Sequence, residues 1–449
     1  MMVTNHPTSF WNRPVPIAPL VSFRITFGVL MFFSLLRFWW RGWVTTVYIE
    51  PKFHFTYTGF EWVKPLGETG MHLLFLIIIL STVLITIGLF YRLSMIVFFI
   101  GFTYVELIDI TTYLNHYYFI SLVAFIMIWL PAAADFSVDC KRNPSSRRLL
   151  VPAWVVGSIR FQMAVVYIFA GLAKLNSDWL IHAEPMRTWL PAKSHLPIIG
   201  KLMYSEWIAY LFSWFGAVYD LCIVFFLLNK KTRKSAYVFV LIFHGATAIF
   251  FPAIGMFPYV MIVSSLIFFS GEFHDKMLSK IPAYRNRLSE ENKAVYHYRF
   301  PELLKVGAIV YILIQLLVPL RFIAYPGNLF WHEQGYRFSW RVMLMEKAGT
   351  AYFTVKDKTN GSAYEVDNKS FLTPLQEKMM STQPDMMVKY AHFLASEYSK
   401  RGIKHPQVYA EVYVALNGRP SRPFIDPKVD LNEQETGWHQ YKWVLPFKD

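Results

Sequence analysis

The stretch Ala153–Trp179 reads AWVVGSIRFQMAVVYIFAGLAKLNSDW. Up to Ala173 it is a nearly unbroken apolar run, about as long as the roughly 20 residues that a helix needs to cross the hydrocarbon core of a bilayer. Lys174 ends this run, and polar residues follow it. The pattern predicts a transmembrane helix with a lysine at a membrane boundary, where a charged amine needs an explanation.

The rest of the chain shares this apolar character. Of the 449 residues, 55% are hydrophobic and only 16% are charged, which is typical of a polytopic membrane protein. Apolar segments of near-spanning length occur at 19–36, 71–90, 93–110, 117–133, 153–173, 206–228, 235–251, 257–270 and 304–322. Two are short for an untilted span, which allows tilted or re-entrant segments. We therefore predict an all-α membrane bundle of about nine transmembrane helices.

The positive charges indicate the orientation of this bundle. A net charge of +14 could indicate nucleic-acid binding, but in a membrane protein basic residues collect in cytoplasmic loops. Two loops and the lysine- and arginine-rich segment 271–303 fall on the same side; the loop cations are Lys141, Arg142, Arg147 and Arg148 in the first and Lys230, Lys231, Arg233 and Lys234 in the second. We predict a cytoplasmic N-terminus, no nucleic-acid partner, and Lys174 on the outer side.

The composition changes near residue 323, which predicts a transmembrane catalytic domain at 1–322 and a small α+β extracytoplasmic domain at 323–449. Within the second domain, residues 351–366 alternate around an Asn-Gly turn signal and predict a hairpin. Residues 373–402 predict a helix that begins with a threonine cap and a proline, and residues 405–418 predict another strand.

Ionisable residues within spans are costly and are therefore functional candidates. Arg24 and Arg160 lie toward the inner ends of their spans, so snorkelling or a structural ion pair explains them best. Asp220 lies deeper in its span, and pairing is its expected role, with one of those arginines as a candidate partner.

Three other polar residues are predicted to lie on the same outer side of the membrane as Lys174. Asn115 and His116 begin one span there, and His244 lies in the outer half of another. Apolar surroundings favour the neutral lysine, which can act as a base, and a neighbouring histidine can donate or pass a proton. Snorkelling of Lys174 to the interface is the alternative. The histidine and cysteine spacings, by contrast, do not predict a metal site.

Five separated blocks carry a family resemblance. These are FAGLAKLNSDW, TYLNHYYFISLVAF, FHGATAIFFPAIGMFPYVM, GYRFSWRVML and ALNGRPSRPFIDPKVDL. Together they resemble the vitamin K-dependent γ-glutamyl carboxylases and their bacterial HTTM-domain relatives. The resemblance implies a membrane enzyme that oxidises vitamin K hydroquinone or menaquinol with O2 to the epoxide. Family members couple this oxidation to carboxylation of glutamate side chains in a peptide or protein with CO2.

The resemblance also implies roles for individual residues. Lys174 corresponds to the family's catalytic lysine and would deprotonate the hydroquinone. Reaction with oxygen would then supply a base strong enough to remove a glutamate γ-proton, which no protein side chain can do at a useful rate. CO2 would trap the resulting carbanion, and His116 would stabilise or protonate it. Such a base requires a site that excludes water, as a roofed site at a membrane boundary would.

A quinone also needs an apolar slot that opens to lipid. We expect Asn115, His244, Gly255, Met256, Phe257, Trp340 and Met343 to contribute to it. The lumenal part is shorter than in animal carboxylases, which favours a bacterial-type enzyme in the plasma membrane with its site facing the periplasm. Two alternatives stay open: a membrane quinol epoxidase without peptide carboxylation, and a non-enzymatic transporter or structural protein.

Overall fold

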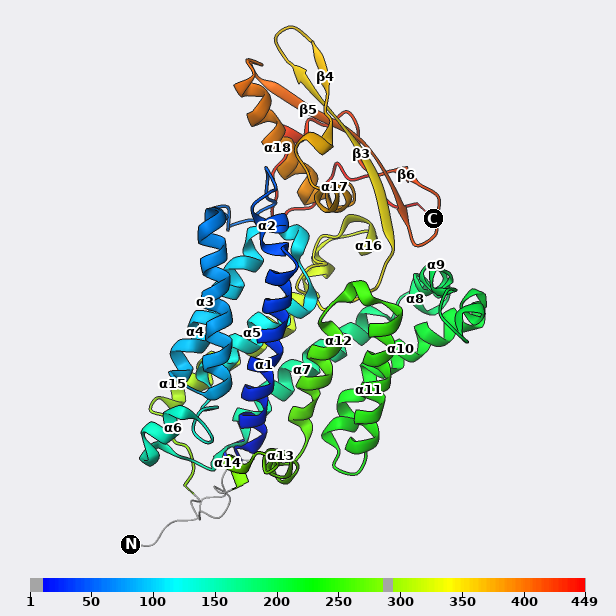
Figure 1. Ribbon diagram of the computed structural model, residues 1–449. Coiled ribbons are helices and arrows are strands. Elements are labelled where there is room, and N and C mark those ends of the chain that lie inside the picture. Colours follow the sequence, from blue (N-terminus) through cyan, green and yellow to red (C-terminus); the bar gives the residue numbers. More distant parts are fainter. Residues whose placement is uncertain (1–10, 286–293, 449) are drawn as a thin grey trace.

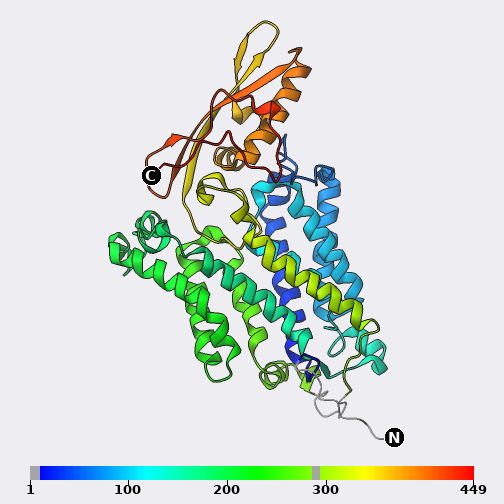
Figure 2. The same cartoon turned by 180° about the vertical axis from the view of Figure 1, so that it is seen from behind.

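A computed structural model describes residues 11–285 and 294–448. Its larger part is a bundle of helices, and a small sheet with two helices stands at one end of that bundle (Figures 1 and 2). The architecture is therefore the predicted helical membrane bundle with a mixed domain at its C-terminal end. The division at 322/323 remains a prediction, because the chain passes between the two parts without a clear linker.

Every predicted apolar segment forms a helix. The helices are α1 (Ala18–Trp40), α3 (Gly67–Ile87), α4 (Tyr91–Ile108), α5 (Asn115–Trp129), α7 (Ala153–Ala173), α10 (Glu206–Leu228), α11 (Arg233–Phe250), α12 (Phe257–Ser265) and α15 (Pro301–Leu317). In the described part of the chain, six helices are long and apolar enough to cross a membrane, or seven if a pair bent by 117° counts as one span. That pair joins α12, with η6 (Leu266–Phe268), to α13 (Gly271–Leu278).

The difference from about nine spans has a physical reason. Helix α5 has only 15 residues, and α11 begins with the charged pair Arg233 and Lys234. A helix of 15 residues is shorter than the hydrocarbon core, so α5 must lie partly against other protein elements. The structure supports six or seven spans, together with shorter helices that complete the bundle.

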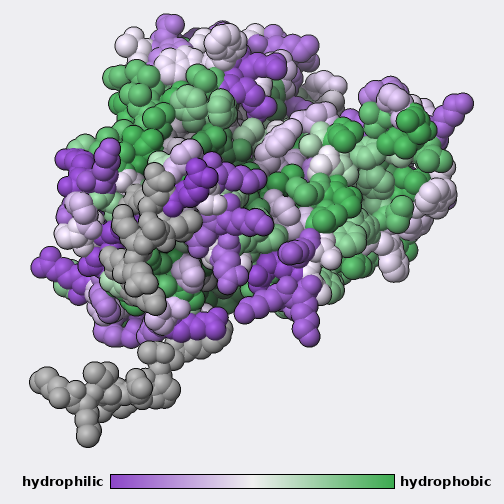
Figure 3. Space-filling view, turned by 60° about the horizontal axis from the view of Figure 1, so that its bottom comes forward, coloured by the Kyte–Doolittle hydropathy of each residue, from purple (hydrophilic) through white to green (hydrophobic). Residues whose placement is uncertain are grey.

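The N-terminal region and the basic loops meet at one end. Strand β1 (Pro14–Pro16) pairs antiparallel with β2 (Leu150–Pro152), and Leu150 also forms a bridge with Val295. The loop between α10 and α11 lies at this same end, opposite the C-terminal domain (Figure 1). Figure 3 brings this end forward and shows hydrophilic side chains gathered over it, with hydrophobic surface beside them. The described parts of the three basic segments therefore lie at the same end, as predicted, and residues 286–293 of the third segment lie outside the described residues.

The C-terminal domain contains an antiparallel sheet in the order β4-β3-β5-β6. Its strands are β3 (Lys347–Asp357), β4 (Ala363–Glu365), β5 (Pro406–Leu416) and β6 (Arg422–Pro423). The predicted hairpin is β3–β4, and the predicted strand is β5. The one helix predicted at 373–402 is two helices in the structure, α17 (Pro374–Met380) and α18 (Pro384–Lys400). They are separate because a proline cannot continue a helix from the preceding turn.

This domain is docked on the outer loops of the bundle. Gln376 donates to Asp109 with 3.0 Å between Nε2 and Oδ2, and Lys52 donates to the carbonyl of Ser370 at 3.0 Å. Trp179 and Met186, from the segment after α7, belong to the same hydrophobic core as Phe353 of the sheet. The loops that surround the end of α7 are therefore held between the bundle and the domain.

Candidate active site

Lys174 is buried at the end of α7, and only 5% of the residue is exposed. Its Nζ lies 2.7 Å from Oδ2 of Asp220 on α10 and 3.3 Å from the carbonyl of Ala170. The same ammonium nitrogen lies 5.3 Å from the centre of the Trp179 ring. A snorkelling lysine would point to water, whereas this one points into the protein and forms a buried ion pair.

The prediction that Asp220 is paired is therefore confirmed, but its partner is Lys174 and neither of the candidate arginines. Arg24 donates to the carbonyl of Phe136 at 2.5 Å, and Arg160 donates to the carbonyl of Ile267 at 2.9 Å. Both arginines bind backbone carbonyls at the inner end of the bundle, while Asp220 lies toward the outer end. Burial makes an unpaired carboxylate costly, and Lys174 is the cation that α7 brings to it.

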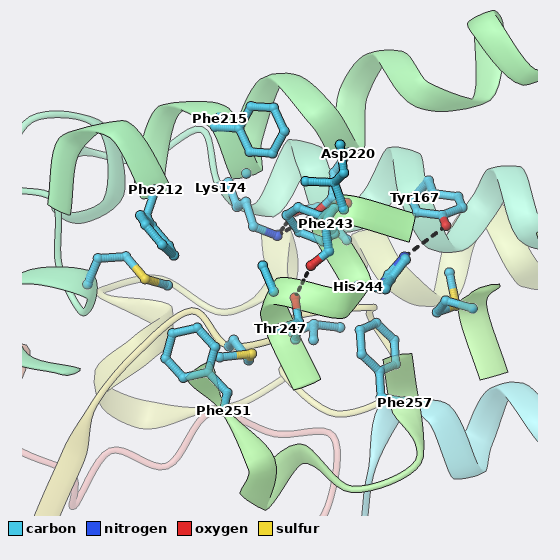
Figure 4. Close-up of a pocket in the computed structure, with 18 of the residues that line it drawn as sticks. Tyr167, Lys174, Phe212, Phe215, Asp220, Phe243, His244, Thr247, Phe251 and Phe257 are labelled. Atoms are coloured by element: carbon cyan, nitrogen blue, oxygen red, sulfur yellow. Dashed lines mark hydrogen bonds and ion pairs between the residues drawn. The ribbon is translucent and has the colours of Figure 1, made fainter. Parts of the chain in front are cut away.

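Lys174 and Asp220 lie in the wall of a cavity of about 340 Å³ (Figure 4). Helices α7, α10, α11 and α12 supply most of its wall, which is mostly apolar and includes seven phenylalanine, tyrosine and tryptophan side chains. The lining residues are Val166, Tyr167, Ala170, Lys174, Trp179, Met186, Leu211, Phe212, Phe215, Gly216, Asp220, Ile242, Phe243, His244, Ala246, Thr247, Phe251, Phe257, Met261, Val342 and Met343. Few of these groups are polar, as in pockets that hold an apolar ligand in one orientation.

His244 is a second polar group in this wall. Its Nε2 lies 3.1 Å from the hydroxyl of Tyr167, which in turn lies 3.3 Å from Oγ of Ser265. Its Nδ1 is buried and has no hydrogen-bond partner among the described residues. The rings of Phe243 and Phe257 pack edge-on against the imidazole. Figure 4 shows Tyr167 and His244 joined at one side of the cavity and Lys174 with Asp220 at another.

Of the predicted site residues, Lys174, His244, Phe257 and Met343 line the cavity. His116 is buried but is not among the lining residues; its ring centre lies 6.0 Å from that of Phe257. Phe257 therefore lies between the cavity and His116, since it contacts both. His116 remains a predicted catalytic residue that is one aromatic ring away from the cavity.

The other predicted contributors lie around this site without lining it. Asn115 donates to the carbonyl of Arg341 at 3.0 Å, which ties α5 to the segment that carries Met343. Trp340 is fully buried, and its ring stacks on Tyr118 with 4.9 Å between the centres. Gly255 and Met256 form the turn before α12, where Gly255 has a φ of +67°. Their predicted role in binding is untested by this geometry.

Tyr167 is the main lining residue that was not predicted from the sequence. It precedes Lys174 by seven residues, and this spacing places both side chains on one face of α7. The position of this tyrosine, two helical turns before the candidate catalytic lysine, could therefore have identified it as a lining residue. The partnership with Asp220 had no such signal, because 46 residues separate the two side chains along the chain.

The loop after Lys174 is bound to the C-terminal domain. Asn176 caps α8 (Ser177–Leu180), and Asp178 accepts hydrogen bonds from Asn417 at 2.7 Å and from Arg419 at 2.7 and 3.1 Å. Burial by itself would raise the pKa of Asp178, but the hydrogen bonds from Arg419 and Asn417 outweigh it and hold this pKa below its usual value. The charged pair fixes the loop that continues from the catalytic candidate.

Models of known protein families match both halves of the chain. The family model described as the HTTM domain matches residues 12–273, and the lumenal domain of vitamin K-dependent γ-carboxylase matches residues 301–449. The chain belongs to the vitamin K-dependent γ-carboxylase family. Membership implies an enzyme that uses vitamin K hydroquinone, O2 and CO2 and that acts on glutamate-containing substrates. No solved structure matches the chain.

The family assignment agrees with the position of the cavity. Residues of both matched regions line it, because Val342 and Met343 come from the γ-carboxylase lumenal region and the other lining residues come from the HTTM region. In the described ranges, no group of three or more histidine, cysteine, aspartate or glutamate residues could hold a metal ion. The polar side chains of the cavity wall include those of Lys174, Asp220, His244, Tyr167 and Thr247.

Proposed function

We propose that this γ-carboxylase family member couples oxidation of a vitamin K-type or menaquinone-type hydroquinone by O2 to γ-carboxylation of glutamate side chains with CO2. The observation that carries the proposal is the buried Lys174–Asp220 pair in the wall of a largely apolar cavity that includes several aromatic rings. Flat aromatic walls suit a naphthoquinol ring, and an amine at hydrogen-bond distance from a carboxylate can exchange a proton with it.

The carboxylate of Asp220 explains how Lys174 can act as a base in an apolar site. With one proton shared over 2.7 Å, the pair is neutral overall whether it is written as ammonium and carboxylate or as amine and carboxylic acid. When the proton lies on Asp220, the amine of Lys174 has a free lone pair that can accept a quinol hydroxyl proton. The new positive charge on the pair then lies beside the negative quinol oxygen.

The apolar wall serves the same chemistry by excluding water. Reaction of the bound quinol with O2 supplies a base strong enough to remove the γ-proton of glutamate, and such a base must be shielded from solvent. Phe212, Phe243 and Phe251 line the same cavity as Lys174 (Figure 4). Leu211 and Ile242 line the cavity and are also 52% and 55% exposed on the outside of the bundle. A long isoprenoid tail could leave the cavity past these residues toward lipid.

The carboxylation of glutamate would take place next to Phe257. We assign the handling of the glutamate carbanion to His116, which lies next to Phe257 and near the segment of Met343. The enzyme would lie in a plasma membrane of bacterial type, with its N-terminus in the cytoplasm and its C-terminal domain outside. The gathering of the basic loops opposite that domain supports this orientation.

A coupled assay tests the proposal. Purified protein in detergent would be supplied with reduced vitamin K, O2, labelled bicarbonate and a short glutamate peptide, and both epoxide and fixed label would be measured. We expect both products from the wild-type protein and neither from a folded Lys174→Ala variant. Lys280→Ala, a change at an exposed lysine, serves as the control and should keep full activity. Unchanged activity in Lys174→Ala would remove Lys174 from the mechanism.

One observation favours a second candidate function. Lys174 lines the cavity, whereas His116 does not, so the geometry supports quinol oxidation more directly than carboxylation. A quinol epoxidase without peptide carboxylation would give epoxide without fixed label in the same assay. In that case, the His116→Ala variant should retain the wild-type rate of epoxide formation.

A further inference from the structure

The buried Nδ1 of His244 is the polar atom of the cavity wall that the proposed mechanism leaves unexplained. The residue is 1% exposed, and its Nδ1 has no partner among the residues that the structure describes. A buried polar atom without a hydrogen bond carries an energetic penalty, because it has lost water and has gained no partner. A ligand oxygen would remove it.

The other ring nitrogen of His244, Nε2, already has a hydrogen-bond partner. The hydroxyl of Tyr167 lies 3.1 Å from Nε2 and 3.3 Å from Oγ of Ser265. The single hydroxyl proton of Tyr167 can point to only one of these two atoms. If it points to His244, the imidazole proton sits on Nδ1, which then is a hydrogen-bond donor. If it points to Ser265, Nε2 carries the proton and Nδ1 is an acceptor.

The Nδ1 atom of His244 can therefore bind a ligand oxygen in either of two chemical forms. As an acceptor it suits the hydroxyl of a quinol, and as a donor it suits the carbonyl of a quinone or an oxidised product. The Lys174–Asp220 pair occupies a different part of the same cavity wall (Figure 4). The cavity therefore has two separated polar groups in an otherwise apolar lining, and a para-quinol has two oxygens on opposite sides of its ring.

We propose that His244, oriented by Tyr167 and Ser265, binds the second ring oxygen of a para-quinol or para-quinone whose first oxygen faces Lys174. This inference rests on the proposed function, since it needs the quinol to occupy this cavity. It gives the cavity a preference for ligands with two opposed oxygens. It also keeps one ring oxygen beside Lys174, because the ring is held at both ends.

Equilibrium binding separates this role from a purely structural one. Dissociation constants would be measured in detergent by isothermal titration for 2-methyl-1,4-naphthoquinone. The same titrations would use 2-methyl-1-tetralone and 3-methyl-1-tetralone, each of which lacks one of the two oxygens. We expect the wild-type protein to bind the naphthoquinone about 2–10-fold more tightly than either ketone, the factor that one net hydrogen bond contributes. In His244→Leu, the advantage over one of the two ketones should disappear.

Matched variants control for damage to the cavity. Ser158→Ala alters a residue of the helix that carries Tyr167, but it lies outside the cavity wall and its hydroxyl donates to the carbonyl of Val155 at 2.9 Å, so discrimination should be unchanged. His244→Gln retains a polar group and should restore part of the preference. Tyr167→Phe releases the imidazole from its fixed orientation and should reduce the preference without removing it.

The outcomes are distinct from those of the activity assay. If His244→Leu keeps the full preference over both ketones, the assignment of His244 is wrong even if the enzyme is active. If the wild-type protein binds no naphthoquinone, the inference and the quinol-binding part of the proposed function both fail. Binding that depends on His244, together with unchanged epoxide formation in Lys174→Ala, would keep the binding site and reject the proposed base.

Discussion

At the scale of single residues, the defining feature is an ion pair in an apolar wall. Lys174 and Asp220 are each 5% exposed, so each side chain has lost most of its hydration. Their separation of 2.7 Å compensates part of that loss. Neither residue could stay charged there without the other, which makes their protonation a property of the pair. A transmembrane pair of this kind is a functional candidate because it costs more than apolar packing.

Replacing one partner should therefore cost more than replacing both. We expect Asp220→Leu to destabilise the protein by about 3–5 kcal/mol, because it leaves the amine of Lys174 buried and unpaired. The Lys174→Met/Asp220→Leu double variant should recover much of that loss. Thermal unfolding of the detergent-solubilised variants measures both effects. A double variant with the summed destabilisation of the two single variants would show that the pair is not coupled.

At the scale of elements, the contact between α7 and α10 sets the geometry of this pair. A Cβ atom at Gly171 would lie 2.7 Å from Cγ and 2.8 Å from the backbone N of Leu221. Leu221 follows Asp220 directly on α10, so the absence of a side chain at Gly171 allows the carboxylate to approach Lys174. Small residues commonly permit such close helix packing in membranes. This explains why a glycine lies three residues before the lysine.

Gly171→Ala should therefore impair the site, whereas a matched change should not. The added methyl group must push α10 away, which should cost about 1–3 kcal/mol and lower the rate of epoxide formation. Gly157 lies on the same helix, and a Cβ atom there would have no atom within 4 Å, so Gly157→Ala should be neutral or stabilise by up to about 1 kcal/mol. Equal effects of the two substitutions would contradict the close-contact explanation.

At the scale of the whole molecule, the C-terminal domain holds the loop that follows the catalytic candidate. Arg419 and Asn417, from the end of β5 and the turn after it, bind Asp178, four residues after Lys174. The family blocks around Lys174 and around Arg419 thus meet in space although they are far apart along the chain, as the separation of 241 residues between Asp178 and Arg419 shows. Docking of the domain and formation of the cavity are consequently linked.

The Asp178–Arg419 link should make stability depend on pH in a defined direction. The folded-state pKa of Asp178 is lowered, so its contribution is fully present above the unfolded pKa of about 3.9 and is lost as pH falls through the folded value. Arg419→Ala should destabilise the protein by about 1–3 kcal/mol at pH 7. The difference from wild type should shrink below about pH 4.

Thermal unfolding of the whole chain from pH 3 to pH 8 checks this dependence. Lys428→Ala, at an exposed position of the same domain, provides the control and should differ little from wild type at any pH. If the destabilisation by Arg419→Ala were the same at pH 3 and at pH 7, the charged form of Asp178 would not be the origin of the effect.

Much of the architecture could be predicted because it depends on local patterns. Apolar runs predicted every long helix, and the Asn-Gly turn predicted the β3–β4 hairpin. The number of spans was less predictable, since α5 is apolar yet too short to cross a bilayer unaided. The helix at 373–402 was predicted as one element, although Pro384 divides it into two.

The sequence by itself determined the membrane class, the arrangement of the basic loops at one end and the family, and it identified Lys174 as a candidate site residue. These features follow from hydrophobicity, charge and short motifs, which are properties of neighbouring residues. Only the tertiary structure decided that Asp220 is the partner of Lys174, that Tyr167 is the partner of His244 and that His116 contacts Phe257 without lining the cavity. Each of these facts depends on how separate helices pack, and packing brings together side chains that no local pattern connects.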